Sequence, residues 1–358
     1  MERYFYLNME ACKSIQFRNL HSIKSKKKIY LGIEILRMLF SFFIVVVHFF
    51  NKDYARRKIL LFPFYALCYY IPTFFVISFY FNYKTFVTRN LDKIKERFLR
   101  ILIPYYIWPT IFFIRYHSFN YLNGFIENDK LKNLYYQYLI GDGFHGVFWF
   151  QFNLILISLL ITIIILLFKK YHLLIIVIFG IIMCIFEFCG YRSQFFSNYN
   201  HPILHTVMNL SSSFIYSISG FFLGYFDILN YFSKSRIKVI SIFLFSFFLI
   251  IGSQNVWLMR YYIIRIDFVS IGLFLIFALF PFDKIKYSFI ISIIKQITSY
   301  TGGVYYLHPE IHSIFKYNLK VIKNRELRGC IVNYIFCYLI CFFGSKAFKE
   351  SKLKYLFI

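Results

Sequence analysis

Three ionisable side chains lie within one apolar stretch, "GIEILRMLFSFFIVVVHFF", which covers residues 32–50. Arg37 and His48 are eleven positions apart, and on an α-helix this separation lies within about 20° of three full turns. Glu34 and Ser41 lie three positions before and four after Arg37, so they share its face. The stretch therefore predicts one polar stripe, with Arg37 and His48 about 16 Å apart along the helix axis.

The residue types in this stripe suit acid–base chemistry. Histidine is a good general base because its ordinary pKa lies near neutral pH, and arginine is a permanent cation that can stabilise a polarised oxygen. The stripe thus offers His48 as a base near one membrane face and Arg37 as a fixed cation nearer the other, with Glu34 beside Arg37. The alternative is that Glu34 and Arg37 pair at the headgroup boundary while His48 reaches the opposite interface. Independent interfacial anchors, however, have no reason to share one face.

Membrane-spanning helices must position these residues. The 358-residue chain is 59% hydrophobic and 24% aromatic, more apolar than a soluble domain can cover. We attribute its net charge of +25 to basic residues near helix ends, which set the membrane topology and contact anionic lipid headgroups. The charge is therefore not taken as a sign of nucleic-acid binding. We predict an all-α polytopic membrane protein of about ten transmembrane helices, in the apolar runs 29–50, 59–82, 101–114, 148–168, 171–190, 203–226, 237–253, 261–281, 290–314 and 330–345.

The basic segments set the expected orientation. The loop 83–100 has six basic residues against two acids, which places it in the cytoplasm. Ten spans then make both termini cytoplasmic. The basic loops 51–58 and 316–329 would lie outside, so they either meet an anionic substrate or lipid, or the helix count is wrong. We divide the chain into a retained basic cytoplasmic tail (1–28), a single transmembrane domain (29–345) and a second basic cytoplasmic tail (346–358).

Two arginines at the cytoplasmic boundary are candidates for anion binding. Arg97 and Arg100 are three positions apart on one face of a helix start, and two guanidinium forks can hold phosphates bidentately. Ordinary positive-inside topology would also explain them.

A second polar face is expected near the C-terminus. Thr301, Tyr305, His308 and His312 follow one another at steps of four, three and four. A histidine pair at this spacing can ligate a metal, but no HExxH motif or third ligand accompanies it, so we expect no metal site. Tyr305 and His308 are either acceptor-side or pore-lining groups, or packed side chains. The seven cysteines have no CxxC spacing and indicate neither metal nor redox chemistry.

Three residues on the predicted outer side could contact a sugar. His145 and Trp149 precede the expected helix 148–168, and Arg115 follows the expected helix 101–114. Aromatic residues are common at membrane interfaces, so Trp149 alone indicates little.

Five segments, in order, resemble the membrane-bound acyltransferase 3 family, whose bacterial members O-acylate cell-surface glycans. The stretch at 32–50 resembles the family's first helix, with its Arg-x10-His spacing. The others are "YIPTFFVISFYF" (70–81), "RFLRILIPYY" (97–106), "HGVFWFQFNLI" (145–155) and "TSYTGGVYYLHPEI" (298–311). One departure is Phe79, where the family usually has glycine; we expect it to alter helix packing without removing a chemical group.

The resemblance implies a multi-pass O-acetyltransferase of a bacterial inner membrane, with acetyl-CoA as co-substrate. It implies that Arg37 and His48 are the required catalytic pair of the first helix, and we expect Glu34 to orient Arg37. It also implies that Arg97 and Arg100 are linked to the donor and that Arg115 is functional. The expected partners are membrane lipids and a glycan or lipid-linked oligosaccharide acceptor, in O-antigen, capsule or exopolysaccharide. Direct transfer and an acetyl-histidine relay both stay open.

Two other classes of membrane protein compete with this interpretation. A flippase for lipid-linked oligosaccharide predicts internal repeat symmetry, and the sequence shows none. A polysaccharide polymerase would be expected to place its key arginines in large external loops. Here they lie at the cytoplasmic boundary and inside the first helix.

Overall fold

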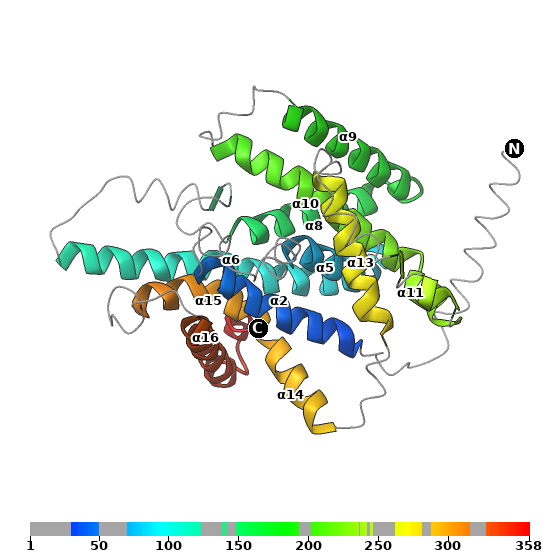
Figure 1. Cartoon of the computed structure of the whole chain (residues 1–358). Coiled ribbons are helices and arrows are strands. Elements are labelled where there is room, and N and C mark those ends of the chain that lie inside the picture. The colour runs from blue at the N-terminus through cyan, green and yellow to red at the C-terminus, as the bar shows by residue number, and fades with distance from the viewer. Residues whose placement is uncertain are drawn as a thin grey trace, which may run out of the picture.

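The structure is a computed structural model that describes residues 30–49, 70–122, 138–139, 141, 148–192, 202–235, 237–241, 244–245, 262–280, 288–315 and 327–358. Within these ranges every regular element is a helix, as the predicted fold class requires (Figure 1). The elements are α2 (Leu31–Phe49), α5 (Tyr70–Val87), α6 (Leu91–Leu122), α8 (Trp149–Leu167), α9 (His172–Arg192), α10 (Pro202–Tyr225), α11 (Ile228–Ser233), α13 (Tyr262–Leu279), α14 (Ser288–Ser299), α15 (Thr301–Ser313), α16 (Leu327–Ala347) and the 3-10 helix η5 (Lys352–Leu356).

The described helices have the apolar exterior of a membrane protein. Leu91–Arg115, Trp149–Leu167 and Gly329–Ala347 are long and apolar enough to cross a bilayer, and three shorter helices are also apolar. Large aliphatic side chains face outward; Leu167 is 69% exposed and Leu174 and Ile185 are each 57% exposed. Such side chains are stable against lipid tails and unfavourable in water. The count of ten spans and the location of the termini stay predictions.

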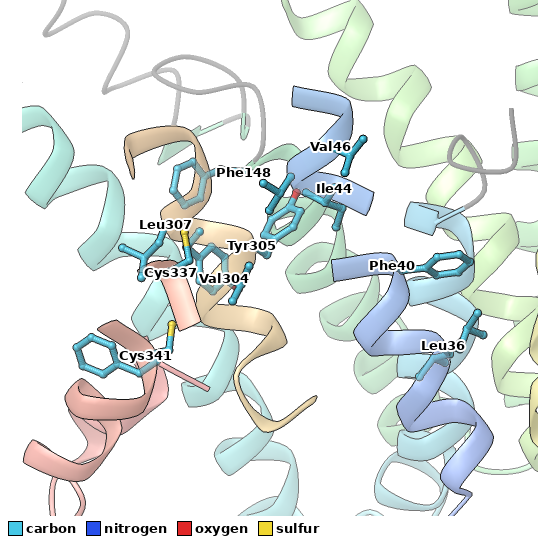
Figure 2. Packing of buried hydrophobic residues seen from close by; sticks show 14 of the residues in the cluster. Leu36, Phe40, Ile44, Val46, Phe148, Val304, Tyr305, Leu307, Cys337 and Cys341 are labelled. Atoms are coloured by element: carbon cyan, nitrogen blue, oxygen red, sulfur yellow. The ribbon is translucent and has the colours of Figure 1, made fainter. Parts of the chain in front are cut away.

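Buried residues form two clusters that meet at α5. The first joins α2, α6, α13, α15 and α16, and the second joins α8, α9 and α10. Figure 2 shows residues of the first cluster from α2, α15 and α16. Val76 and Tyr80 of α5 belong to the first cluster, whereas Phe75 and Phe79 belong to the second. A Cβ atom on Gly220 of α10 would lie 2.3 Å from the Val76 carbonyl oxygen, so glycine allows these two backbones to approach closely.

Helix α6 begins ten residues before the predicted start at position 101. Its first turns are polar but favour a helix, so a search for apolar runs misses them. A short turn separates it from α5, and the side chain of Asn90 accepts a hydrogen bond from the backbone N–H of Lys93 at 3.0 Å, a typical N-cap. Arg97 and Arg100 therefore lie inside a long helix and not at its end.

The predicted helix at 290–314 is two helices, α14 and α15, that meet at Tyr300. Tyr300 has φ −107° and ψ 6°, which is not helical. Gly302 and Gly303 follow at once, and two glycines weaken a helix at this point. The apolar run continues across this break, so hydropathy predicts one helix where the structure has two.

The end of the chain packs into the first cluster. Within the segment predicted as a tail, Phe357 stacks on Phe348 at 5.8 Å between ring centroids and meets Trp108 edge-on at 5.9 Å. The indole N–H of Trp108 donates to the Leu356 carbonyl oxygen at 3.0 Å. Residues 348–358 thus help to fix α6 against α15 and α16.

Several predictions lie outside the described residues. These are the tail 1–28, the basic loop 51–58, most of the loop 316–329 and the first part of the expected helix 59–82. Of the expected helix 237–253, residues 237–241 and 244–245 are helical and the rest is not described.

Candidate active site

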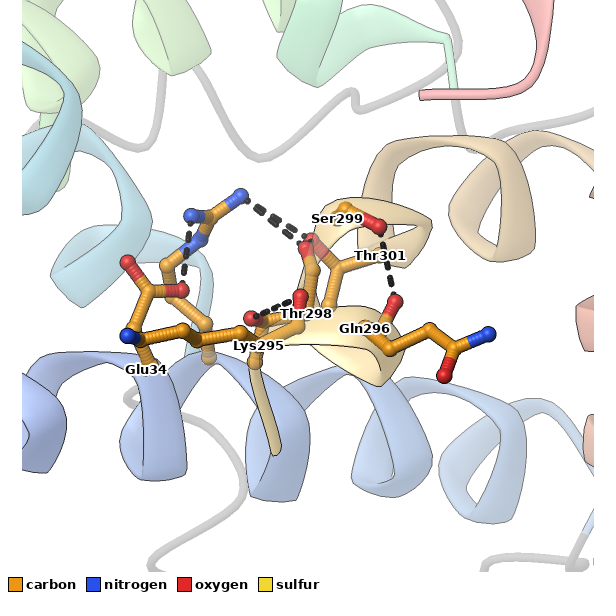
Figure 3. A network of polar contacts seen from close by, with 7 residues as sticks. Glu34, Lys295, Gln296, Thr298, Ser299 and Thr301 are labelled. Carbon is orange, nitrogen blue, oxygen red and sulfur yellow. Dashed lines mark hydrogen bonds and ion pairs between the residues drawn. The ribbon is translucent and has the colours of Figure 1, made fainter. Parts of the chain in front are cut away.

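Arg37 connects α2 to the break between α14 and α15. Its Nη1 donates to Glu34 Oε2 at 3.2 Å, and its Nη2 donates to the Thr298 carbonyl oxygen at 3.4 Å and to Thr301 Oγ1 at 3.2 Å (Figure 3). The Thr298 carbonyl belongs to the last turn of α14, where backbone acceptors lack helical partners. A cation is favourable there because the helix dipole is negative at its C-terminus. Arg37 therefore stabilises the break.

The polar face of α2 continues toward α16. Ser41 is 1% exposed, and its hydroxyl donates to the Met38 carbonyl oxygen at 2.8 Å. The same hydroxyl lies 2.9 Å from the Tyr334 hydroxyl of α16. The stripe predicted for α2 thus faces neighbouring helices at Glu34, Arg37 and Ser41, as a bundle-facing stripe should.

At the other end of α2, His48 faces a second histidine. The ring centroids of His48 and His308 are 4.9 Å apart, with 47° between the ring planes. His48 is exposed in the last turn of α2, whereas His308 is 1% exposed. The Tyr305 ring lies 6.2 Å from His308 and packs on Phe150 at 5.5 Å. An accessible imidazole therefore stands beside a buried one.

Helix α15 brings these contacts together. Thr301 meets Arg37 and His308 meets His48; the two α15 positions are seven residues apart, about 20° short of two turns. The polar faces that the sequence predicted separately in α2 and α15 therefore face each other. Between them, the Tyr305 ring lies toward Ile44 of α2 (Figure 2).

Arg97 and Arg100 have different surroundings. Arg97 is 9% exposed, and its Nη2 donates to Ser78 Oγ at 3.2 Å and to Ser158 Oγ at 3.1 Å. Arg100 is exposed, pairs with Glu96 and lies over the Tyr355 ring at 5.6 Å. The two guanidinium groups thus have different partners and do not form one bidentate phosphate site in this structure.

Phe79 explains part of the burial of Arg97. The Phe79 ring lies 5.3 Å from the Arg97 guanidinium carbon, and the Phe86 ring lies 5.2 Å from it. The two rings stack on each other at 5.8 Å. Where the family usually has glycine, this chain thus places an aromatic face that can hold a cation by a cation–π interaction.

The remaining predicted residues are Arg115, Trp149 and His145. Arg115 of α6 forms an ion pair with Glu310, which is two residues past His308 and 7% exposed. Trp149 is the first residue of α8 and packs, half-buried, against the second cluster. His145 lies outside the described residues.

Three parts of this site were not predicted from the sequence. They are the helix break at Tyr300, the role of the Thr298 carbonyl, and Glu310 as the partner of Arg115. The Gly-Gly pair at 302–303 signals the break. Contacts between segments far apart in the sequence leave no periodic signal in a single sequence.

No group of three or more His, Cys, Asp or Glu side chains that could hold a metal occurs in the part of the chain that the structure describes. The polar groups that α2 brings together with α15 and α16 are an arginine, hydroxyls and imidazoles. These groups can bind an anion, stabilise an oxyanion and move a proton.

Comparison with known proteins identifies the family. The family model described as "Acyltransferase domain" (Acyl_transf_3) matches residues 30–356, nearly the whole chain. No curated protein and no solved structure matches it. This chain belongs to the acyltransferase 3 family of membrane acyltransferases.

Proposed function

We propose that this protein is an O-acetyltransferase of a bacterial inner membrane. It moves an acetyl group from cytoplasmic acetyl-CoA to a hydroxyl of a cell-surface polysaccharide, in O-antigen, capsule or exopolysaccharide. The observation that supports this most is the α2–α15 interface, which holds Arg37 at one end and the His48–His308 pair at the other. These ends are about 16 Å apart along α2, roughly half of the hydrocarbon thickness of a bilayer.

In this proposal His48 is the group that meets the reacting atoms. It takes the proton of the acceptor hydroxyl as a general base, or it receives the acetyl group and passes it on. Arg37 holds the donor or stabilises the negative charge that develops on the thioester oxygen. Glu34 orients Arg37 through the hydrogen bond to Nη1.

The donor would enter beside Arg100. This arginine is exposed, and Lys354 and Tyr355 of the C-terminal segment lie next to its partner Glu96. A phosphate of coenzyme A can displace the carboxylate and bind the guanidinium bidentately. Arg97 would reach the donor only by leaving Ser78 and Ser158, so we propose that it supports the donor site by fixing α5, α6 and α8 around it.

The acceptor side would include His308, Tyr305 and Arg115. Arg115 and Glu310 form an ion pair next to the histidines on α15, and charged pairs of this kind can exchange partners with sugar hydroxyls. Trp149 and His145 would lie toward the same outer side.

The cellular test compares surface glycans. Cells with the wild-type gene, without it, and with His48→Ala or Arg37→Ala variants are grown, and the acetate on the surface polysaccharide is measured by NMR. We expect acetylation in the wild type alone. Normal acetylation with membrane-inserted His48→Ala protein would rule the assignment out. A flippase would instead change the amount of surface glycan and leave its acetyl content per sugar unchanged.

A further inference from the structure

His308 is held in place by contacts from two helices. Its backbone carbonyl accepts a hydrogen bond from Asn333 Nδ2 of α16 at 3.0 Å, and Cys337 Sγ donates to Asn333 Oδ1 at 3.1 Å. Asn333 and Cys337 are both fully buried. The backbone of α15 at His308 is therefore fixed to α16 by a buried polar network.

The hydrogen bond within α15 assigns the protons of the His308 ring. Its Nδ1 lies 3.3 Å from the Val304 carbonyl oxygen. A carbonyl oxygen only accepts, so Nδ1 must bear the hydrogen, and in the neutral ring Nε2 is then the acceptor. His308 in this state is a base, and the ring next to it is His48.

Among the described residues, several other titratable or charged groups lie around His308. They are His48 of α2, Tyr305 and Glu310 of its own helix, Arg115 of α6 through Glu310, and Cys337 of α16 through Asn333. Glu310 is paired with Arg115, so its charge is partly neutralised. The group best placed to exchange a proton with His308 is thus His48.

We propose that His308 is a positioning residue for catalysis, whose Nε2 accepts the proton that His48 takes from the acceptor hydroxyl. This inference rests on the proposed function. In the step, the hydroxyl O–H bond breaks, a C–O bond to the acetyl carbon forms and the C–S bond of the donor breaks. The proton passes from the hydroxyl to His48 and His308, and returns through His48 to the leaving thiolate. Atoms and charge balance without a further reactant.

The test uses purified full-length protein in lipid nanodiscs. The substrates are acetyl-CoA and deacylated surface glycan from cells that lack this gene, and the readout is kcat as a function of pH. His308→Asn keeps an amide N–H that can donate to the Val304 carbonyl but has no group at the Nε2 position. His308→Gln is a second variant that does not titrate, and His312→Gln on the same helix is the matched control.

We expect His308→Asn to lower kcat by about 10²-fold, the lower end of the usual contribution of proton transfer, with an unchanged KM for acetyl-CoA. One titration should also vanish from its pH profile, whereas His312→Gln should keep the wild-type profile. A folded His308→Asn or His308→Gln protein with the wild-type pH profile would overturn the inference. A structural role would change the amount of folded protein and leave that profile in place.

A second measurement does not require catalysis. Diethyl pyrocarbonate modifies neutral histidine, and mass spectrometry gives the rate of modification of His48 as a function of pH. We expect the pH at the midpoint of this curve to differ between wild-type and His308→Asn protein and to be the same in wild-type and His312→Gln protein. Equal midpoints in the wild type and both variants would overturn the inference. If wild-type protein releases no CoA thiol, the proposed function fails, and this measurement still tests the histidine pair.

Discussion

Arg37 joins two parts of the fold through one side chain. Its planar guanidinium bonds Glu34 on one side and both the Thr298 carbonyl and Thr301 on the other. A fork with several fixed donors can do this, whereas the compact ammonium of lysine cannot reach the same set of acceptors. Arg37 therefore contributes a charge and also fixes the start of α15, the helix that presents His308.

We expect Arg37→Lys to lower kcat/KM for acetyl transfer by about ten- to a hundredfold. A hydrogen bond to a charged group contributes about 1.5–3 kcal/mol, and about 1.4 kcal/mol corresponds to a tenfold change in rate. Glu34→Gln keeps an acceptor for Arg37 and should lower kcat/KM less than Arg37→Lys does. The comparison is made with purified variants and labelled acetyl-CoA. If Arg37→Lys protein had the same kcat/KM as the wild type, the several fixed donors of the guanidinium group would not be needed.

Substitutions of Arg97 and of Arg100 should have different effects. Removing Arg97 leaves Ser78 and Ser158 without their donor and ends two aromatic contacts, so Arg97→Ala should destabilise the protein by about 2 kcal/mol. Arg100→Ala removes an exposed group and should raise the KM for acetyl-CoA without a change in stability. Thermal unfolding in detergent and donor titrations measure the two effects. An unchanged melting temperature in Arg97→Ala would contradict its structural role.

At the scale of elements, α15 is the helix on which the candidate site depends. It meets α2 on one face, and its first turn lies against the end of the chain. Gly303 makes this approach possible, because a Cβ atom there would lie 2.4 Å from Cys341 Sγ and 2.9 Å from the Phe357 carbonyl oxygen. The position of His308 thus depends on how tightly the C-terminal segment packs.

Gly303→Ala should therefore destabilise the protein by about 1–3 kcal/mol, the usual cost of overpacking a filled site. Gly302→Ala should be destabilised as well, because its Cβ atom would lie 2.5 Å from the backbone carbonyl oxygen of Ile358. Melting temperatures of both variants and of the wild type in detergent check the expectation. A Gly303→Ala protein as stable as the wild type would contradict this packing.

Much of the helical layout could be predicted from the sequence, because apolar runs and helical spacing report directly on helices and their faces. The stripe of α2 and the Thr301–Tyr305–His308 face of α15 were found in this way. The break at Tyr300 was not, because two glycines cost only about 1 kcal/mol each and leave hydropathy unchanged. Arg97 and Arg100 are about 60° apart on the helix, and the boundary between buried and exposed surface falls between them.

In the molecule as a whole, two contacts join basic segments that are far apart in the sequence. Arg89 after α5 donates to the Lys169 carbonyl oxygen after α8 at 3.2 Å. Arg100 lies over Tyr355 in the C-terminal segment. We predict that these segments share the cytoplasmic side of the membrane, because basic loops remain on that side. The face between α2 and α15 runs from Arg37 to the histidine pair at the opposite end of α2.

This arrangement predicts which lysines share a side of the membrane. An impermeant lysine reagent is added to sealed vesicles of known orientation, and modified residues are identified by mass spectrometry. Lys93, Lys169 and Lys352 are all exposed, and we expect the reagent to modify all three from the cytoplasmic side only. Opened vesicles serve as the control. Modification of Lys352 from the side opposite to Lys93 would contradict the arrangement.

In the proposed function, His48 performs acyl transfer at the end of the α2–α15 interface. The most direct measurement is transfer of labelled acetyl from acetyl-CoA to deacylated surface glycan, by wild-type and His48→Gln protein in nanodiscs at equal amounts of folded protein. We predict that the wild type labels the glycan and that His48→Gln gives only background. Equal labelling by the two proteins would show that His48 does not perform the transfer.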